Sequence, residues 1–191
     1  KCISSRINNS MASELFVDNI TGKTGTSGSA PITLSGNSAT LGSGVTFPAG
    51  HIIQVVNATI TNKLSSSTKI TSSTAVCDVR DQITITSGNA VLVHWAAYLY
   101  AARTSNALIK ASIRLGTTAS NSGTDLVVSK TGNTAGDEHT QTSLWVYDTS
   151  PGSTTPDYVM MVERLSSNTD GVYLNSHTTT DLYCYLFEVQ Q

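Results

Sequence analysis

Histidine is the residue type in this chain best suited to metal binding or acid–base catalysis, because its side chain titrates near neutral pH. The sequence has four histidines: His51, His94, His139 and His177. No two of them form an HxH or HExxH pair, the spacings that place two imidazoles on one metal ion. His94 lies within the apolar run AVLVHWAAYLYAA, where a hydrogen-bonded core or interface residue is expected rather than a ligand. Asp137 and Glu138 precede His139, but consecutive residues on a polar turn point in different directions, so a solvated loop is predicted and no metal site.

Motifs for nucleophilic catalysis and phosphate binding do not occur either. The chain has no GxSxG elbow. The stretch GKTGTSG at residues 22–28 resembles a phosphate loop only in composition, because it lacks the GxxxxGK[ST] order and a following helix. Paired carboxylates could cleave a glycosidic bond if folding brought them together. The residues available for such a pair are Asp125, Asp148, Asp157, Glu163 and Asp170. We predict no catalytic residue, no enzyme activity and no cofactor.

Aromatic residues provide a candidate recognition surface. Trp145 and Tyr147 share one face of the run TSLWVYDT, near loops rich in Asn, Ser, Thr and Asp, and Asp148 is the third residue expected to take part in surface recognition. A flat apolar ring beside polar groups is the arrangement that binds sugars. The alternative interpretation is that Trp145 packs in the core.

The composition indicates the kind of fold that holds these residues. Only 13% of the 191 residues are charged, whereas 54 are Ser or Thr, which compete with the helix backbone for hydrogen bonds. A formal net charge of −2 argues against nucleic acid and anionic membranes as partners, and no apolar run is long enough to span a bilayer. Apolar alternation with period two recurs along the chain, with turn residues between the runs. About eight strands are predicted, in residues 51–61, 75–86, 90–102, 107–116, 126–131, 142–149, 158–164 and 182–189. The predicted fold is all-β: an antiparallel β-sandwich or jelly roll.

Several of the predicted strands are apolar on both faces. In LYCYLFEV, Leu182, Cys184 and Leu186 point one way and the aromatic residues, with Val189, point the other. A sandwich needs one apolar face per sheet, so a second one indicates burial against identical subunits or under the N-terminal segment of the same chain. The residues expected at a subunit interface are His94, Tyr98, Tyr100, Tyr183, Tyr185 and Phe187.

Residues 1–50 differ in kind from residues 51–191, the predicted β domain. They are rich in Gly, Ser and Thr, with short apolar patches, which predicts either a flexible linker or an extended arm that docks on a partner surface. The residues expected to dock are Leu15, Phe16, Val17, Ile20, Ile32 and Leu34. Met11 leaves open whether the first ten residues belong to the functional chain. Cys77 and Cys184 lie in apolar runs and are expected to be buried, with a disulfide between them left open.

Three segments carry a resemblance to a known group of proteins. They are MASELFVDNITGKTGTSGSAPITLSG, SGVTFPAGHIIQVV and the Ser/Thr-rich β region that closes in LYCYLFEVQQ. Together they resemble small virion structural proteins, of the fibre or capsid decoration type, from marine tailed bacteriophages and cyanophages in particular. The resemblance covers most of the chain from Met11 onward.

The resemblance implies a homotrimeric protein on the virion surface, fastened to capsid or tail proteins by its N-terminal arm and exposing its β domain. A capsid decoration or head-fibre protein is the first expectation, because no long repetitive shaft precedes the domain. A tail-fibre protein that binds a host receptor or surface glycan is the alternative. A polysaccharide depolymerase is the second alternative.

Overall fold

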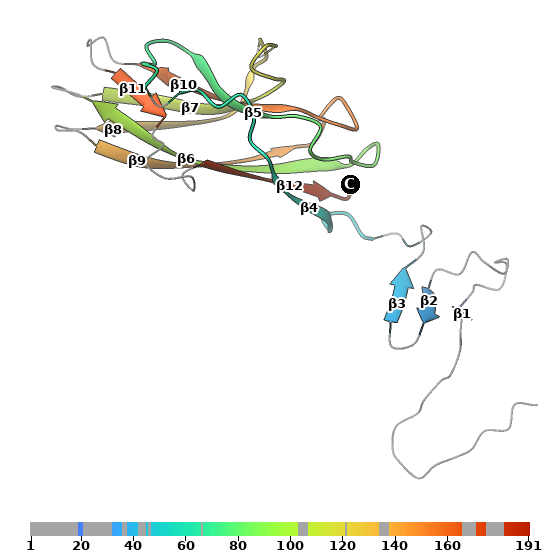
Figure 1. Ribbon diagram of the computed structural model, residues 1–191. Coiled ribbons are helices and arrows are strands. Elements are labelled where there is room, and N and C mark those ends of the chain that lie inside the picture. The colour runs from blue at the N-terminus through green and yellow to red at the C-terminus, as the bar shows by residue number, and fades with distance from the viewer. Residues whose placement is uncertain are drawn as a thin grey trace, which may run out of the picture. The chain divides into compact units, whose positions relative to one another are not determined.

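The computed structural model describes residues 19–20, 32–35, 38–41, 45, 47–65, 67–102, 107–120, 122–133, 138–165, 171–174 and 182–191. Within these ranges every regular element is a β-strand, as the composition predicts (Figure 1). The chain divides into two compact units, Lys1–Phe47 and Pro48–Gln191. The predicted division lies between residues 50 and 51.

The N-terminal unit contains one small antiparallel sheet. Its strands are β1 (Asn19–Ile20), β2 (Ile32–Ser35) and β3 (Ser38–Leu41), in the order β1-β2-β3. Ile20 pairs with Ile32, so two of the residues expected to dock lie opposite each other on neighbouring strands. The described residues of this unit therefore form a hairpin with a short third strand, too small a sheet to be stable alone in water.

The second unit is a sandwich of two antiparallel sheets. Its strands are β4 (Ile52–Ala58), β5 (Thr74–Val79), β6 (Ala90–Ala102), β7 (Ala107–Leu115), β8 (Asp125–Asn133), β9 (Glu138–Asp148), β10 (Tyr158–Arg164), β11 (Gly171–Leu174) and β12 (Leu182–Val189). The larger sheet has the order β4-β12-β6-β9, with β11 also paired to β6, and the smaller sheet has the order β5-β10-β7-β8 (Figure 1).

The strand order identifies a jelly roll. We count the strands of this unit from β4 as the first to β12 as the eighth and leave β11 out. The larger sheet then has the order first, eighth, third and sixth, and the smaller sheet the order second, seventh, fourth and fifth. Successive long strands therefore alternate between sheets, except for the β7–β8 hairpin, in the pattern of two Greek keys. The sequence predicts a sandwich or a jelly roll, and the pairing selects the jelly roll.

Strand β6 organises the larger sheet because it is paired along both edges. One edge pairs with β9, from Val91 opposite Asp148 to Ala101 opposite Glu138. The other edge pairs first with β12 and then, from Leu99 onward, with β11. A 13-residue strand with both edges paired fixes the register of three neighbours at once.

The core lies between the two sheets and is built by period-two alternation. In β6, the side chains of Val91, Val93, Trp95, Ala97 and Leu99 are completely buried, whereas Leu92, His94, Tyr98 and Tyr100 on the other side are only partly buried. The small residue Ala96 lies on that other side and is buried as well. Cross-strand neighbours continue the inner layer: Leu186 lies opposite Val93 and Cys184 opposite Trp95. The smaller sheet contributes Ile109, Ala111 and Ile113 from β7 and Tyr158, Met160 and Val162 from β10. The expected placement of Cys184 and Leu186 on one side of β12, opposite the aromatic residues, is confirmed.

Three local predictions are corrected by the structure. The run at 75–86 ends as a strand at Val79, because the chain turns at Asp81 with φ of 48°, although Ile83 and Ile85 are still buried. Strand β11 was not predicted. Val189 was expected on the outward side of β12 with the aromatic residues, but it is buried, although its register against β6 continues unbroken to Ala90.

Both described cysteines are free and buried, as expected for small apolar residues. Burial raises the pKa of the Cys77 thiol well above its ordinary value, with smaller contributions from Cys184 and Asp78. Burial also raises the pKa of Cys184. Thiols held in this neutral form are poor nucleophiles and poor metal ligands.

Adjacent residues of β7 give a direct test of the layer assignment. Ile109 is 2% exposed in the core, whereas Leu108 is 39% exposed on the other side of the strand. Ile109→Ala should lower the free energy of unfolding by about 2–5 kcal/mol, because it leaves a cavity among close-packed neighbours. Leu108→Ala removes the same number of carbon atoms from an exposed site and should cost less than about 1 kcal/mol. Urea unfolding of both variants measures the difference, and equal losses would contradict the assignment.

Candidate functional site

The outer surface of the larger sheet carries a continuous band of aromatic and apolar side chains. Cross-strand pairing places Val55, Phe187, Leu92 and Tyr147 in one row across all four long strands. The next row contains Asn57, Tyr185, His94 and Trp145. Beyond it lie Tyr183, and then Tyr98 opposite Gln141. We call this surface the aromatic face and define it as Val55, Leu92, His94, Tyr98, Trp145, Tyr147, Tyr183, Tyr185 and Phe187.

His94 and Trp145 form the closest ring contact on the aromatic face. Their ring centroids are 3.7 Å apart with planes inclined by 6°, which is a parallel stack. The centroids of Tyr183 and Tyr185 lie 5.6 and 6.4 Å from that of His94. Phe187 lies 6.2 Å from Trp145 between ring centroids. These separations fall within the range in which aromatic pairs attract one another, so the rings form one cluster.

The imidazole of His94 is held in a defined position. Its Nε2 atom shares a hydrogen bond of 2.9 Å with the hydroxyl of Ser143, on the neighbouring strand β9. Partial burial among rings lowers the pKa of His94 below its ordinary value of 6.5, because the charged form is desolvated. The neutral imidazole therefore prevails at pH 7.

The structure brings together two sets of residues that the sequence separates. The expected subunit-interface residues and the expected recognition residues Trp145 and Tyr147 lie on the same outward side of one sheet. Trp145 is 51% exposed and Tyr147 is 49% exposed, so the alternative that Trp145 packs in the core is wrong. Tyr100 follows on the same side of β6, with its ring 6.0 Å from that of Tyr173 on β11.

Asp148 is a correction. It was expected beside Trp145 at the surface, but it points into the protein and is 7% exposed. Its carboxylate accepts hydrogen bonds of 2.9 Å from the hydroxyl of Tyr158 and 3.1 Å from the backbone N–H of Ser150. Asp148 faces inward because side chains alternate along β9 and its neighbour Tyr147 faces outward. Its role is to satisfy a buried tyrosine.

Val55 and Leu92 were not among the expected interface residues, although Leu92 alternates with His94 and Tyr98 in the run at 90–102. Val55 is 56% exposed on the edge strand β4 and lies opposite Phe187. Leu92 lies between Phe187 and Tyr147. The only signal in the sequence is strand alternation, and that places a residue on a face only when the strand order is also known.

The structure describes only some of the residues predicted to dock. Ile20 lies in β1, and Ile32 and Leu34 lie in β2, where Ile32 is partly buried. Leu15, Phe16 and Val17 lie outside the described residues. Their role in docking stays a prediction.

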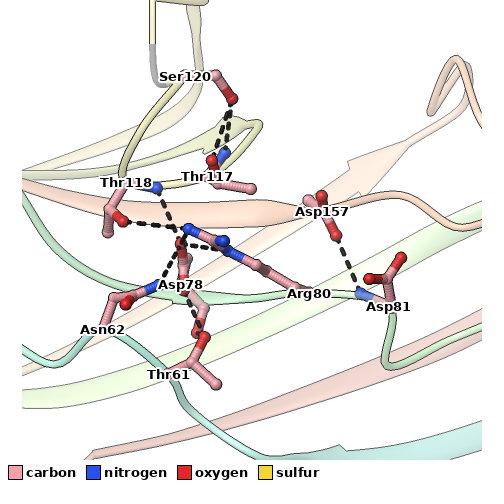
Figure 2. A network of polar contacts seen from close by, with 9 residues as sticks. All are labelled: Thr61, Asn62, Asp78, Arg80, Asp81, Thr117, Thr118, Ser120 and Asp157. Atoms are coloured by element: carbon pink, nitrogen blue, oxygen red, sulfur yellow. Dashed lines mark hydrogen bonds and ion pairs between the residues drawn. The ribbon is translucent and has the colours of Figure 1, made fainter.

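A second candidate site is the polar network around Asp78 in β5 (Figure 2). The Asp78 side chain is completely buried. Its carboxylate accepts hydrogen bonds from Thr61 Oγ1 at 2.5 Å and from the backbone N–H of Thr118 at 2.8 Å. It also accepts from Asn62 Nδ2 and Arg80 Nε, both at 3.0 Å. Donors from both sides therefore surround the carboxylate, which leaves little room for a metal ion.

The Asp78 network joins segments that lie far apart in sequence. Thr61 and Asn62 follow β4, and Thr118 belongs to the turn after β7, which begins at Gly116. Gly116 has φ of 114°, and a Cβ there would lie 2.8 Å from the backbone oxygen of Ser120, so the turn needs glycine. The network is therefore a structural tie between two loops.

The outer face of the smaller sheet carries a cluster of charged groups. Lys110 Nζ lies 2.6 Å from Asp125 Oδ2 and 3.6 Å from Glu163 Oε2. Arg114 and Ser112 also donate hydrogen bonds to Asp125, at 2.6 and 2.8 Å. Partial burial alone would raise the pKa of Asp125, but these hydrogen bonds lower it to about 2. An open groove of about 610 Å³ beside the cluster is lined by Lys110, Val128, Lys130, Glu163 and Leu165.

The carboxylates considered for glycosidic cleavage have separate structural roles. Asp125 is ionised by its cationic neighbours, which is the opposite of what a general acid requires. Asp157 accepts a 3.0 Å hydrogen bond from the backbone N–H of Asp81 (Figure 2). Asp148 accepts a hydrogen bond from the hydroxyl of Tyr158. Asp170 lies outside the described residues.

The described residues contain no candidate metal site and no helix that could cross a membrane. No group of three or more His, Cys, Asp or Glu side chains in the described part of the chain could hold a metal ion. His139 and His177 are not covered by that statement, because their side chains lie outside what the structure describes. No helix among the described residues is long and apolar enough to cross a membrane.

The Asp78 network predicts an acid-sensitive contribution to stability. Burial alone would raise the pKa of Asp78, but the surrounding hydrogen bonds lower it below its ordinary value of 3.8. The carboxylate therefore stabilises the fold above pH of about 4, and this contribution is lost as the pH falls. Asp78→Asn should lower the free energy of unfolding at pH 7 by about 2–3 kcal/mol and reduce the loss on acidification.

Asp81→Asn is the matched control for this prediction. Asp81 is exposed at φ of 48°, a conformation that asparagine adopts readily, so its change should stay within about 0.5 kcal/mol. Urea unfolding between pH 3 and 7 compares the two variants. Equal losses would show that the network does not stabilise the fold.

His94 should titrate below pH 6.5, the ordinary value for histidine. Because the unfolded chain takes up a proton at that pH and the folded chain resists it, stability should fall as the pH drops from 6.5 through the folded pKa. NMR titration of the imidazole signals measures the midpoint, with His94→Gln identifying the resonance. A midpoint at or above 6.5 would contradict the burial of this ring.

Comparison of the sequence with known proteins does not identify a family for this chain. No protein-family model matches the sequence, and no curated protein is similar to it. The function of the chain therefore has to be inferred from its residues and from their arrangement.

Proposed function

We propose that the chain is a structural protein of the bacteriophage virion surface, of the capsid decoration or head-fibre type. In this proposal the N-terminal unit attaches the protein to the particle, and the jelly-roll domain is displayed outward as a homotrimer. The partners are two further copies of the chain and phage capsid or tail proteins, without nucleic acid or membrane.

One observation carries the proposal: the chain divides into a small N-terminal unit and a separate jelly-roll domain. A sheet as short as β1-β2-β3 gains stability by adding to a larger surface, through apolar contacts and backbone hydrogen bonds to a partner strand. The jelly roll buries a continuous core of its own. The sequence resemblance to virion structural proteins supports the same two roles, attachment by the N-terminal unit and outward display of the jelly-roll domain.

The polar groups of the domain support a binding role rather than catalysis. Asp78, Asp125 and Asp148 each accept several hydrogen bonds from neighbouring side chains or backbone. A catalytic acid or base needs a group free to exchange a proton at the working pH. We therefore propose no enzyme activity, and purified protein should release no reducing sugar from host envelope polysaccharide.

A second candidate function is recognition of a host glycan by a tail-fibre protein. The observation that favours it is the half-exposed state of Trp145 and Tyr147. Sugar rings stack on such side chains, and polar loops at the domain ends could supply hydrogen bonds.

Deletion of residues 11–44 tests the attachment role. The deletion removes the strands of the N-terminal unit and leaves Pro48–Gln191 intact. We expect binding to particles that lack this protein to fall at least 100-fold, because avidity from three arms multiplies each weak contact. Co-sedimentation with such particles measures binding, and circular dichroism checks that the β domain has kept its strands.

Val128→Glu serves as the control variant, because Val128 is 42% exposed on β8 of the smaller sheet, away from the aromatic face, and this variant should keep particle binding through its intact arm. Retained binding by the deletion variant would contradict the proposal. A cryo-electron microscopy map of the virion then locates the chain. Density on the capsid shell supports decoration, and density at the tail tip would favour receptor recognition instead.

A further inference from the structure

We infer that the aromatic face is the surface through which copies of this chain bind one another, so that its occupant is a second copy of the chain. The inference rests on the proposed function only for the number of copies. The existence and place of the contact are argued from the described residues alone.

The chemistry of the aromatic face is that of the centre of a protein–protein interface. Its members are aromatic or aliphatic, and the polar residues between them, Asn57, Gln141 and Ser143, are uncharged. Interface centres are depleted in charged residues and enriched in Tyr, Trp and Phe. A surface without charge matches another copy of itself and offers nothing to select a charged partner.

The two outer faces of the sandwich differ in this respect. The outer face of the smaller sheet carries Lys110, Arg114, Asp125 and Glu163, which are arranged in ion pairs. That outer face also exposes Leu108 and Val128, so the two faces differ in charge: ion pairs lie on one, and no member of the aromatic face carries a formal charge at pH 7. Ordinary solvation of a sandwich would make both outer faces polar.

The aromatic face and the exposed edge strand beside it together supply the area for a contact. Four strands spaced about 4.8 Å apart give a width of about 19 Å, and Leu92 to Tyr98 on β6 spans about 20 Å. The plan area of the face is therefore at most about 400 Å², because β4 and β12 end before the row of Tyr98. A typical stable interface buries about 800 Å² of accessible surface on each partner, so the relief of the side chains and the exposed residues of β4 contribute the rest.

The edge strand β4 gives independent support. It pairs with β12 on one side and ends the sheet order on the other. Its sequence IIQVVNA has no charged residue and no proline, the devices that normally protect an open edge. Ile52 and Val55 are more than half exposed on it, and Ile53 is 41% exposed. An edge left this apolar is expected to be covered in the working protein.

The ring geometry favours a second copy over a sugar. One face of the Trp145 indole is covered by the imidazole of His94 at 3.7 Å. The only carboxylate next to these rings in β9, Asp148, is buried on the other side of the strand. Sugar sites need free ring faces with fixed hydrogen-bonding groups beside them. Clustered rings interlock well with the rings of another copy.

Charge placed on the aromatic face tests the inference. Trp145→Glu introduces a carboxylate at an exposed outward position, where the isolated domain tolerates it, but association would bury it unpaired. Val128→Glu is the matched control, because Val128 is 42% exposed on β8 of the opposite sheet. Sedimentation equilibrium of the full chain gives the mass, which should correspond to three chains of 20.1 kDa for the wild type and for the control. Trp145→Glu should weaken association at least 30-fold, the effect of an interface hot spot.

Tryptophan fluorescence provides a second measurement on the unmodified protein. The chain has two tryptophans, and Trp95 is completely buried, so quenching by iodide reports on Trp145. Quenching should fall as the protein concentration rises through the association midpoint. Quenching that does not depend on concentration would place the contact elsewhere.

Three outcomes would overturn the inference. The wild type could be a single chain at 100 μM, which includes the case in which the N-terminal segment of the same chain covers the face. Trp145→Glu could associate as well as the control. Trp145→Glu could also lose binding to envelope polysaccharide while keeping its mass, which would make the face a glycan site. A single-chain wild type would also remove the avidity of three arms, but the arm deletion measures attachment separately, and loss of particle binding by that deletion leaves the inference standing.

Discussion

The pairing of β6 along both edges is the constraint on which the rest of the domain depends. Side chains alternate with period two, so the register of β9, β12 and β11 against β6 decides which residues face the core. A slip of one residue would bring His94 into the core and expose Trp95 to water. The buried inner side and the aromatic outer side therefore follow from one set of backbone hydrogen bonds.

Much of the fold could be predicted because apolar and polar residues alternate within single strands, and this pattern can be recognised without knowing which strands pair. The run 90–102 and the alternation in 107–116 specify strands and inward faces without any knowledge of partners. The strand order could not be predicted in the same way, because pairing of β4 with β12 joins residues more than 120 positions apart. For the same reason Val55 could not be placed on the aromatic face, because its neighbour Phe187 lies on another strand. Asp148 was misplaced although the local pattern was available, since it alternates with Tyr147 along β9 and therefore faces inward.

The buried carboxylates of the domain stabilise its fold through hydrogen bonds to neighbouring segments. Asp78 ties two loops together, Asp148 satisfies Tyr158, and Glu188 accepts hydrogen bonds of 2.7 Å from Asn89 and from the backbone N–H of Thr86. Each carboxylate is matched by donors, as buried charged groups require. The exposed side of the larger sheet, by contrast, is mainly aromatic and apolar.

The contact between β4 and β12 has a consequence for the making of the protein. The first long strand of the jelly roll pairs with the last, and Gln190 exchanges backbone hydrogen bonds with Gly50 and His51. The larger sheet cannot close until β12 has left the ribosome. During synthesis the apolar β4 stays without its partner strand until more than 120 further residues have been made, and non-local pairing of this kind is slow. Until β12 has been made, the uncharged strand β4 can therefore pair with the wrong strand, from this chain or from another.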